Sequence, residues 1–293
     1  MKKYIYPALL ANAATLGVHW IYNVQYLQNL SEKQSLLFLV QDEQVFKQAA
    51  PSFFAYPNTV LGDLSVQGEI LKWLYDAKSS NNKFNQADYK TLLLSKFLPG
   101  GSYKGYVESY GKKLVAIDLL DQLKTDSSQI TLNDDQLVGF IPYILAKELD
   151  LSLDDAWSLA SLFTKQSFYL DYYRMFDSIL ENPEEENIKH AIEQSLILAP
   201  KDKLPTLEKA IQMSNTNDFI EEYAGRACSV DDAIPVIIHV LYHSTSFEDA
   251  LNINAKIGGA SADRSLLIGA ILSQVYDIPT DWNEKVSPKL ILK

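Results

Sequence analysis

The residues best suited to chemistry lie in a short polar loop near position 260, here called the late loop (residues 258–264). Two glycines, Gly258 and Gly259, interrupt the chain and are followed by Ser261, Asp263 and Arg264, after which an apolar segment with helical spacing begins. A helix N-terminus presents unpaired backbone N–H groups and the positive end of a dipole. The late loop is therefore a candidate site for an anion or for oxygen ligands.

A second loop of the same kind, here called the early loop (residues 62–67), precedes an expected helix over 67–78. It supplies Asp63, Ser65 and Gln67. A Gly-Asp pair ahead of a hydroxyl residue is also a common helix cap, so these residues alone leave both capping and ligand binding open.

Three more polar side chains are candidates for the lining of a cleft. Asn12 and His19 lie near the start of the chain, and His19 is followed by Trp20. A histidine beside a tryptophan is either a partly buried side chain with satisfied hydrogen bonds or a ring nitrogen facing a ligand. Lys104 follows the glycines at 100 and 101, where a phosphate could be held, although a turn that leads into a helix explains the same residues.

Composition limits the class of protein. The 293-residue chain has a formal net charge of −11, which argues against nucleic acid or an anionic membrane as its partner. The single cysteine, Cys228, allows no internal disulfide and no metal site built from several thiolates. No signal peptide and no run of about 20 apolar residues is apparent, so we expect a soluble cytoplasmic protein.

Helical spacing dominates the chain, whereas clean strand alternation is rare. Short stretches rich in proline, glycine and asparagine separate the helical segments, and none is long enough to be a linker between domains. We therefore predict a single all-α domain over residues 1–293, made of many helices of medium length.

The order of the motifs resembles the ADP-ribosylglycohydrolase superfamily, and within it the branch that contains selenoprotein J and the jellyfish J-crystallins. The early loop is similar to the family's Gly-Asp-x-Thr-Asp-Asp motif, and the late loop to its Asp-x-Asp-Thr motif after paired glycines. Further similarity lies in residues 11–22, 103–107 and 228–235 and in Asn254.

This resemblance implies a fold of the ADP-ribosylglycohydrolase type and metal-assisted glycoside cleavage, in which the family's aspartates hold two magnesium ions. The matching positions carry no carboxylate. They are Val66, Gln67, Ala260 and Ala262. Because magnesium binds through carboxylates and waters, we expect no metal pair and no cofactor, beyond at most one weakly held magnesium ion.

The resemblance also implies that the two loops meet in one cleft that binds a small nucleotide-like or sugar ligand. The expected lining is Asn12, His19, Asp63, Ser65, Gln67, Lys104, Gly258, Gly259, Ser261, Asp263 and Arg264. Arg264 is expected to contact an anionic ligand, with an internal pair to Asp263 as the alternative. No catalytic residue and no oligomeric state is assigned.

Two functions stay open at this point. The first is an enzyme or binding protein of the family that hydrolyses or binds an ADP-ribose-like glycosidic ligand through an eroded metal site. The second is an inactive relative that acts as a ligand-binding, interaction or structural protein, as the resemblance to crystallins allows.

Overall fold

The computed structural model describes residues 3–181 and 188–286. Within them the chain is helical and has no sheet, which confirms the predicted all-α class. No helix in the described part is long and apolar enough to cross a membrane. The α-helices are α1 (Ile5–Thr15), α2 (Val24–Ser31), α3 (Glu43–Gln48), α4 (Val66–Ser80), α5 (Gln86–Phe97), α6 (Ser109–Gln122), α7 (Ile141–Leu149), α8 (Leu153–Ala160), α9 (Phe168–Leu180), α10 (Ile188–Ser195), α11 (Leu204–Gln212), α12 (Thr216–Tyr223), α13 (Val230–His243), α14 (Phe247–Ile257) and α15 (Ser261–Leu272).

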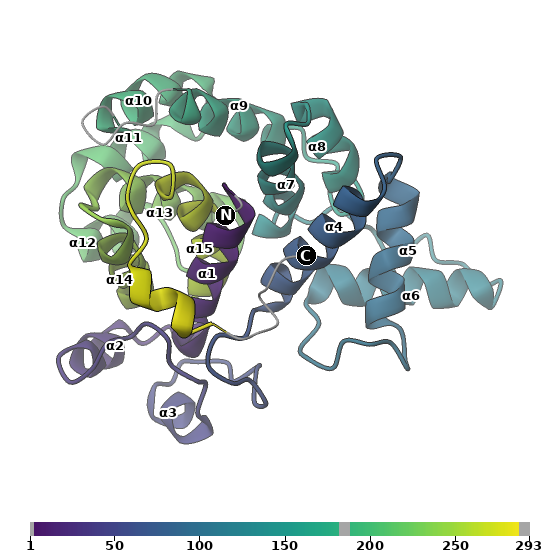
Figure 1. The fold of residues 1–293 in the computed structure, drawn as a ribbon, viewed down its shortest axis with the longest axis horizontal. Coiled ribbons are helices and arrows are strands. Elements are labelled where there is room, and N and C mark those ends of the chain that lie inside the picture. Colours follow the sequence, from purple (N-terminus) through teal and green to yellow (C-terminus); the bar gives the residue numbers. More distant parts are fainter. Residues whose placement is uncertain (1–2, 182–187, 287–293) are drawn as a thin grey trace.

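Helices α1 and α15 form the centre of the molecule, although they come from opposite ends of the chain (Figure 1). Every residue of α15 is buried, and so are ten of the eleven residues of α1. Helices that are apolar on all sides are stable only when other elements surround them. Here α4, α7, α13 and α14 pack around the pair.

Close approach of the two central helices depends on Gly269. A Cβ atom at this position would lie 2.6 Å from both the Cβ of Ala11 and the carbonyl oxygen of Pro7. The small residues Gly269 and Ala11 let the two helices pack closely. Their contact brings the start of α15 next to the middle of α1 and thereby positions the late loop.

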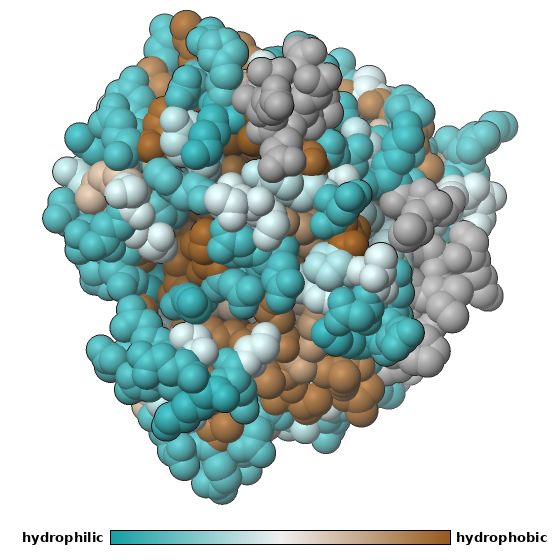
Figure 2. All heavy atoms as spheres, turned by 60° about the vertical axis from the view of Figure 1, so that its left-hand side comes forward, coloured by the Kyte–Doolittle hydropathy of each residue, from teal (hydrophilic) through white to brown (hydrophobic). Residues whose placement is uncertain are grey.

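The polar surface covers most of this core. Figure 2 shows one face of the molecule, on which hydrophilic residues predominate and hydrophobic residues are visible in the hollows between them. The buried apolar side chains form one large cluster and a smaller one. The smaller cluster consists of Leu16, Trp20, Ala55, Tyr56 and Ala262, and it lies beside the candidate site.

The late loop is fixed by two glycines with positive φ angles, 76° at Gly258 and 63° at Gly259. The backbone of Gly259 pairs in both directions with the segment after α1, because Trp20 N donates to Gly259 O and Gly259 N donates to Ile21 O, each at 2.7 Å. A Cβ atom on Gly259 would lie 2.0 Å from the carbonyl oxygen of Arg226. The loop therefore positions His19 and Trp20 at the start of α15.

Candidate functional site

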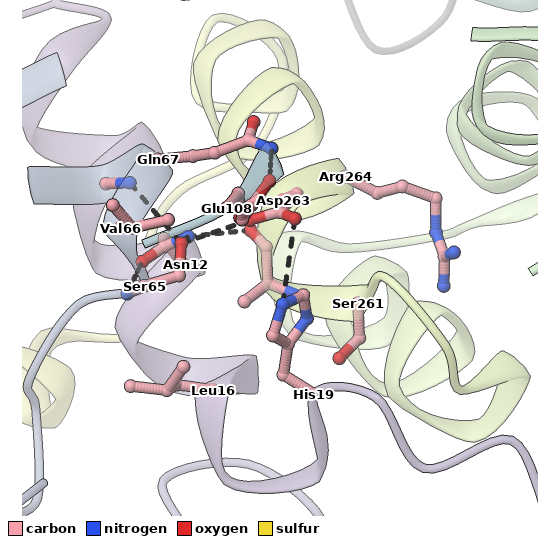
Figure 3. A network of polar contacts seen from close by, with 12 residues as sticks. Asn12, Leu16, His19, Ser65, Val66, Gln67, Glu108, Ser261, Asp263 and Arg264 are labelled. Atoms are coloured by element: carbon pink, nitrogen blue, oxygen red, sulfur yellow. Dashed lines mark hydrogen bonds and ion pairs between the residues drawn. The ribbon is translucent and has the colours of Figure 1, made fainter. Parts of the chain in front are cut away.

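Asn12, in the middle of α1, joins the early and late loops (Figure 3). Its Nδ2 donates to Ser65 Oγ at 2.9 Å and to Ala262 O at 2.8 Å, and its Oδ1 accepts from Ser65 N at 2.9 Å. Ser65 Oγ in turn donates to Asp263 Oδ1 at 3.1 Å. All four residues are buried. The two loops thus meet, as the resemblance implied. Ser65 contacts Asp263, 198 positions later in the sequence, and Asn12 connects Ser65 to the backbone of Ala262.

His19 faces Asp263 across this network. Ala262 N donates to His19 Nδ1 at 3.2 Å, so the ring proton of the neutral imidazole resides on Nε2, which lies 3.6 Å from Asp263 Oδ2. Burial, and secondly the charge of Arg264, lowers the pKa of His19 to about 3. Burial raises the pKa of Asp263 to about 7, although the Ser65 hydrogen bond and Arg264 oppose the rise. A neutral histidine therefore faces a carboxyl group that titrates near neutrality.

The structure adds Glu108, which the sequence reasoning missed. Glu108 immediately precedes α6 and is 4% exposed. Its Oε2 accepts from Gln67 Nε2 at 3.3 Å (Figure 3). Burial, followed by the charge of Asp263, raises the pKa of Glu108 well above its usual range. The sequence signal was weak, because a single glutamate after the 103–107 motif has no partner nearby in the chain.

The two carboxyl groups make this network an acid–base pair rather than an ion pair. The charge of Asp263 opposes the ionisation of Glu108, which favours one protonated acid beside one carboxylate. Glu108 Oε1 and Gln67 Oε1 are buried and have no hydrogen-bond partner among the described residues, and the same holds for His19 Nε2 and Asp263 Oδ2. Buried polar atoms of this kind mark places where water or a ligand atom is needed.

Arg264 requires a correction to the expectation that it contacts a ligand. It is fully buried, and its side chain points away from the Asp263 carboxylate (Figure 3). Its Nε donates to Asn254 Oδ1 at 2.8 Å, its Nη2 to Gly258 O at 2.6 Å and its Nη1 to Arg226 O at 3.4 Å. Burial lowers its pKa to about 10, which leaves it charged at neutral pH. The guanidinium is directed at backbone and amide oxygens and thereby holds the late loop.

The other late-loop residues also have structural partners. Ser261 Oγ donates to Thr15 O at 3.2 Å, and Asn254 Nδ2 donates to Ser261 O at 2.8 Å. Gly258 and Gly259 shape the turn, as described above. These contacts connect α14, α15 and α1 around the buried network.

A surface pocket of about 530 Å³ lies next to the buried network. Asp63 and Lys104 line it, together with Tyr56, Tyr103 and Tyr106. The lining does not include the other predicted site residues. The expected single cleft is therefore divided into an open pocket and a buried network behind it.

Aromatic rings separate the two parts. His19 stacks on Trp20 with ring centroids 4.4 Å apart, and Tyr106 meets Trp20 edge-on at 5.3 Å. Tyr56 closes the wall, with a ring centroid 6.0 Å from that of His19 and a hydroxyl that accepts from Val66 N at 3.1 Å. Sequence reasoning gave no sign of this wall, because Tyr56 belongs to an irregular segment.

The site does not fit a pair of magnesium ions. Val66 and Ala262 are fully buried and offer no side-chain oxygen, and Ala262 belongs to the smaller apolar cluster. Gln67 instead donates to Glu108. Among the described residues, no group of three or more histidine, cysteine, aspartate or glutamate side chains is arranged to hold a metal ion.

Comparisons with known proteins add no family or relative. No protein-family model matches the sequence, and no curated protein matches it.

Proposed function

We propose that this chain is a member of the ADP-ribosylglycohydrolase superfamily that binds a glycosidic ligand, of nucleoside or sugar type, without metal-assisted hydrolysis. One observation carries the proposal. Asn12 links the starts of two helices whose loops resemble the family's metal motifs, while the matching aspartate positions hold side chains without carboxylates.

The pocket has the composition expected of a site for such a ligand. Aromatic rings offer flat apolar faces to a base or a sugar ring, and hydroxyl, amide and carboxylate groups can orient its polar edges. The polar residues that line it are Asn58, Thr59, Asp63, Glu69, Ser102 and Lys104. Its volume of about 530 Å³ suits a ligand of nucleoside size.

A second candidate function, metal-independent glycoside hydrolysis, is favoured by Glu108 and Asp263. One protonated carboxyl group and one carboxylate are the groups that such a reaction uses, the acid to protonate the leaving oxygen and the carboxylate to stabilise the developing positive charge. These groups lie behind the aromatic wall, so a substrate would have to displace Tyr56 or Tyr106 to reach them. Because of this obstacle, we favour ligand binding over hydrolysis as the function.

Calorimetric titration with adenosine, ribose and ADP-ribose, with and without magnesium, tests the proposal. We expect at least one of these compounds to bind with an affinity that magnesium does not change, and to be recovered uncleaved. Magnesium-dependent cleavage of ADP-ribose would refute the proposal. Cleavage without magnesium would support the second candidate. Failure of all three to bind at millimolar concentration would leave an interaction or structural role.

The correspondence of the loops with metal motifs can be tested by restoration. The variant carries aspartate at all four positions: Val66→Asp, Gln67→Asp, Ala260→Asp and Ala262→Asp. If the backbone frame matches the family's, magnesium should raise the melting temperature of this variant and leave that of the wild type unchanged, because a ligand stabilises the state that binds it. A variant that folds but does not respond to magnesium would contradict the correspondence.

A further inference from the structure

Two histidines of α13, four residues apart in the sequence, share one hydrogen-bond acceptor on α11. His239 Nδ1 donates to Ala210 O at 2.9 Å, and His243 Nε2 donates to the same oxygen at 3.2 Å. Ala210 lies in the last turn of α11, and the final carbonyl groups of a helix have no partner within it. This histidine pair (His239 and His243) therefore caps α11 and holds it on α13.

His239 also holds α12. Because its Nδ1 carries the proton of the neutral ring, its Nε2 accepts from Thr216 Oγ1 at 2.9 Å, at the first residue of α12. The ring of Phe219, in the next turn of α12, stacks on the imidazole with centroids 4.8 Å apart. One neutral imidazole thus connects α11, α12 and α13, which lie together at one edge of the molecule (Figure 1).

The surroundings of both rings favour the uncharged form. His239 is fully buried, and its ring centroid lies 4.4 Å from that of His243, so a proton on one ring opposes a proton on the other. Burial lowers the pKa of His239 to about 4, although the hydrogen bond to Ala210 opposes the fall. Burial also lowers the pKa of His243, and the charge of Lys189 in α10 adds to this effect.

No carboxylate among the described residues compensates a proton on the pair. Glu193 of α10 instead accepts from Tyr242 Oη at 2.7 Å, and Glu221 of α12 pairs with Arg226 at 2.8 Å. Apart from Lys189, no charged group on the described helices around the pair shifts the pKa of either imidazole. These groups are His190 and Glu193 in α10, Glu208 and Lys209 in α11, Asp218, Glu221 and Glu222 in α12, Asp231 and Asp232 in α13, Glu248, Asp249 and Lys256 in α14, and Asp263 and Arg264 in α15.

Helix α12 is connected to the late loop through Arg226. Arg226 Nη2 lies 2.8 Å from Glu221 Oε1 of α12, and Arg226 Nε donates to Ile257 O at 3.0 Å, at the end of α14. The carbonyl oxygen of Arg226 accepts from Ala260 N at 2.9 Å and from Arg264 Nη1 at 3.4 Å. Displacement of α12 from α13 therefore removes a support of the late loop.

We propose that the histidine pair is an acid-sensitive joint, which keeps α11 and α12 on α13 while both imidazoles are neutral and lets these helices open locally, together with the late loop, when a proton enters. The open state binds protons with the ordinary histidine pKa of 6.5, whereas the closed state excludes them, so opening becomes easier as the pH falls below about 6.5. His239 alone should raise the opening equilibrium constant about tenfold between pH 7.5 and 5.5. The inference does not depend on which ligand the pocket binds.

Hydrogen–deuterium exchange of the full chain, expressed as protection factors at pH 7.5 and 5.5, tests the joint. We expect protection of the α11 and α12 amides to fall about tenfold or more at the lower pH, and protection of residues 258–264 to fall with it, while α1 stays protected. Exchange is measured helix by helix because protonation of Glu108 and Asp263 has the opposite effect on stability. Equal protection of α11 and α12 at both pH values would overturn the inference.

Variants assign the response to the pair. His239→Asn with His243→Gln keeps amide donors for Ala210 O but cannot take up a proton, so the response of α11, α12 and the late loop should disappear. His190→Gln is the matched control, because this histidine of α10 is 72% exposed, and it should respond as the wild type does. The inference fails if the double variant keeps the response, or if the late loop responds without α12.

A single variant covers the case in which the double variant does not fold. His243→Gln changes only the partly buried last residue of α13 and should make the response smaller than in the wild type. An unchanged response would contradict a role for His243.

Discussion

Removal of the Arg264 guanidinium should destabilise the protein strongly. In Arg264→Met the hydrogen bonds to Asn254 Oδ1 at 2.8 Å and Gly258 O at 2.6 Å are lost, and the weaker one to Arg226 O at 3.4 Å is lost with them. Hydrogen bonds of a charged group contribute about 1.5–3 kcal/mol each, so the two short ones amount to about 3–6 kcal/mol. Relief of the buried charge offsets part of this loss. We expect the free energy of unfolding to fall by about 3–5 kcal/mol.

Arg174→Met is the matched control. Arg174 Nη1 lies 2.9 Å from Asp171 Oδ1, but the two side chains are 56% and 44% exposed. An exposed pair of this kind contributes under about 1 kcal/mol. Urea unfolding followed by circular dichroism measures both variants. The reasoning is refuted if Arg264→Met is no less stable than Arg174→Met, and a loss of ligand binding at unchanged stability would restore Arg264 as a ligand contact.

Two further predictions concern the loop and the carboxyl pair. Gly259→Ala should unfold at a much lower temperature than the wild type, since its Cβ would lie 2.0 Å from Arg226 O at a φ of 63°; an unchanged melting curve would show that the late loop is adjustable. The raised pKa of Glu108 means that its folded state holds a proton that the unfolded state releases, so this stabilisation is complete below the ordinary glutamate pKa of 4.5 and is lost as pH rises through the folded pKa. The same sign holds for Asp263, between the ordinary aspartate pKa of 3.8 and its folded pKa of about 7. Melting temperatures of the wild type and of Glu108→Gln test this prediction when they are measured from pH 3.8 to about 7 and above. We expect the melting temperature of the variant to decline less with rising pH than that of the wild type. Parallel curves would contradict the raised pKa of Glu108.

The sequence predicted the helical class and much of the frame of the site. The helix expected over 67–78 is α4, from Val66 to Ser80. Ser65 is a helix cap, one of the two interpretations that its motif left open, because its hydroxyl accepts from Gly68 N; the same hydroxyl donates to Asp263, and ligand binding stays a prediction. Periodicity and capping are local properties, which explains why they could be predicted from the sequence.

The direction of side chains around the site could not be predicted in this way. Arg264 was assigned to a ligand because its true partners are mostly backbone carbonyls, which leave no signature in the sequence. Glu108 gains its chemistry only from burial beside Gln67 and Asp263. The wall formed by Tyr56 depends on tertiary packing of an irregular segment.

The pairing of α1 with α15 has a consequence for the synthesis of this protein. Asn12 leaves the ribosome early, whereas its partner Ala262 emerges 250 residues later. Until then α1, which is apolar on nearly every side, lacks the helix with which it makes most of its contacts and can pack only against earlier elements such as α4 and α7. The nascent chain must therefore carry an incompletely covered hydrophobic helix through most of its translation. We expect ribosome-bound fragments that stop before α15 to be protease-sensitive and to associate with chaperones, and protection to appear abruptly once residue 272 has left the exit tunnel.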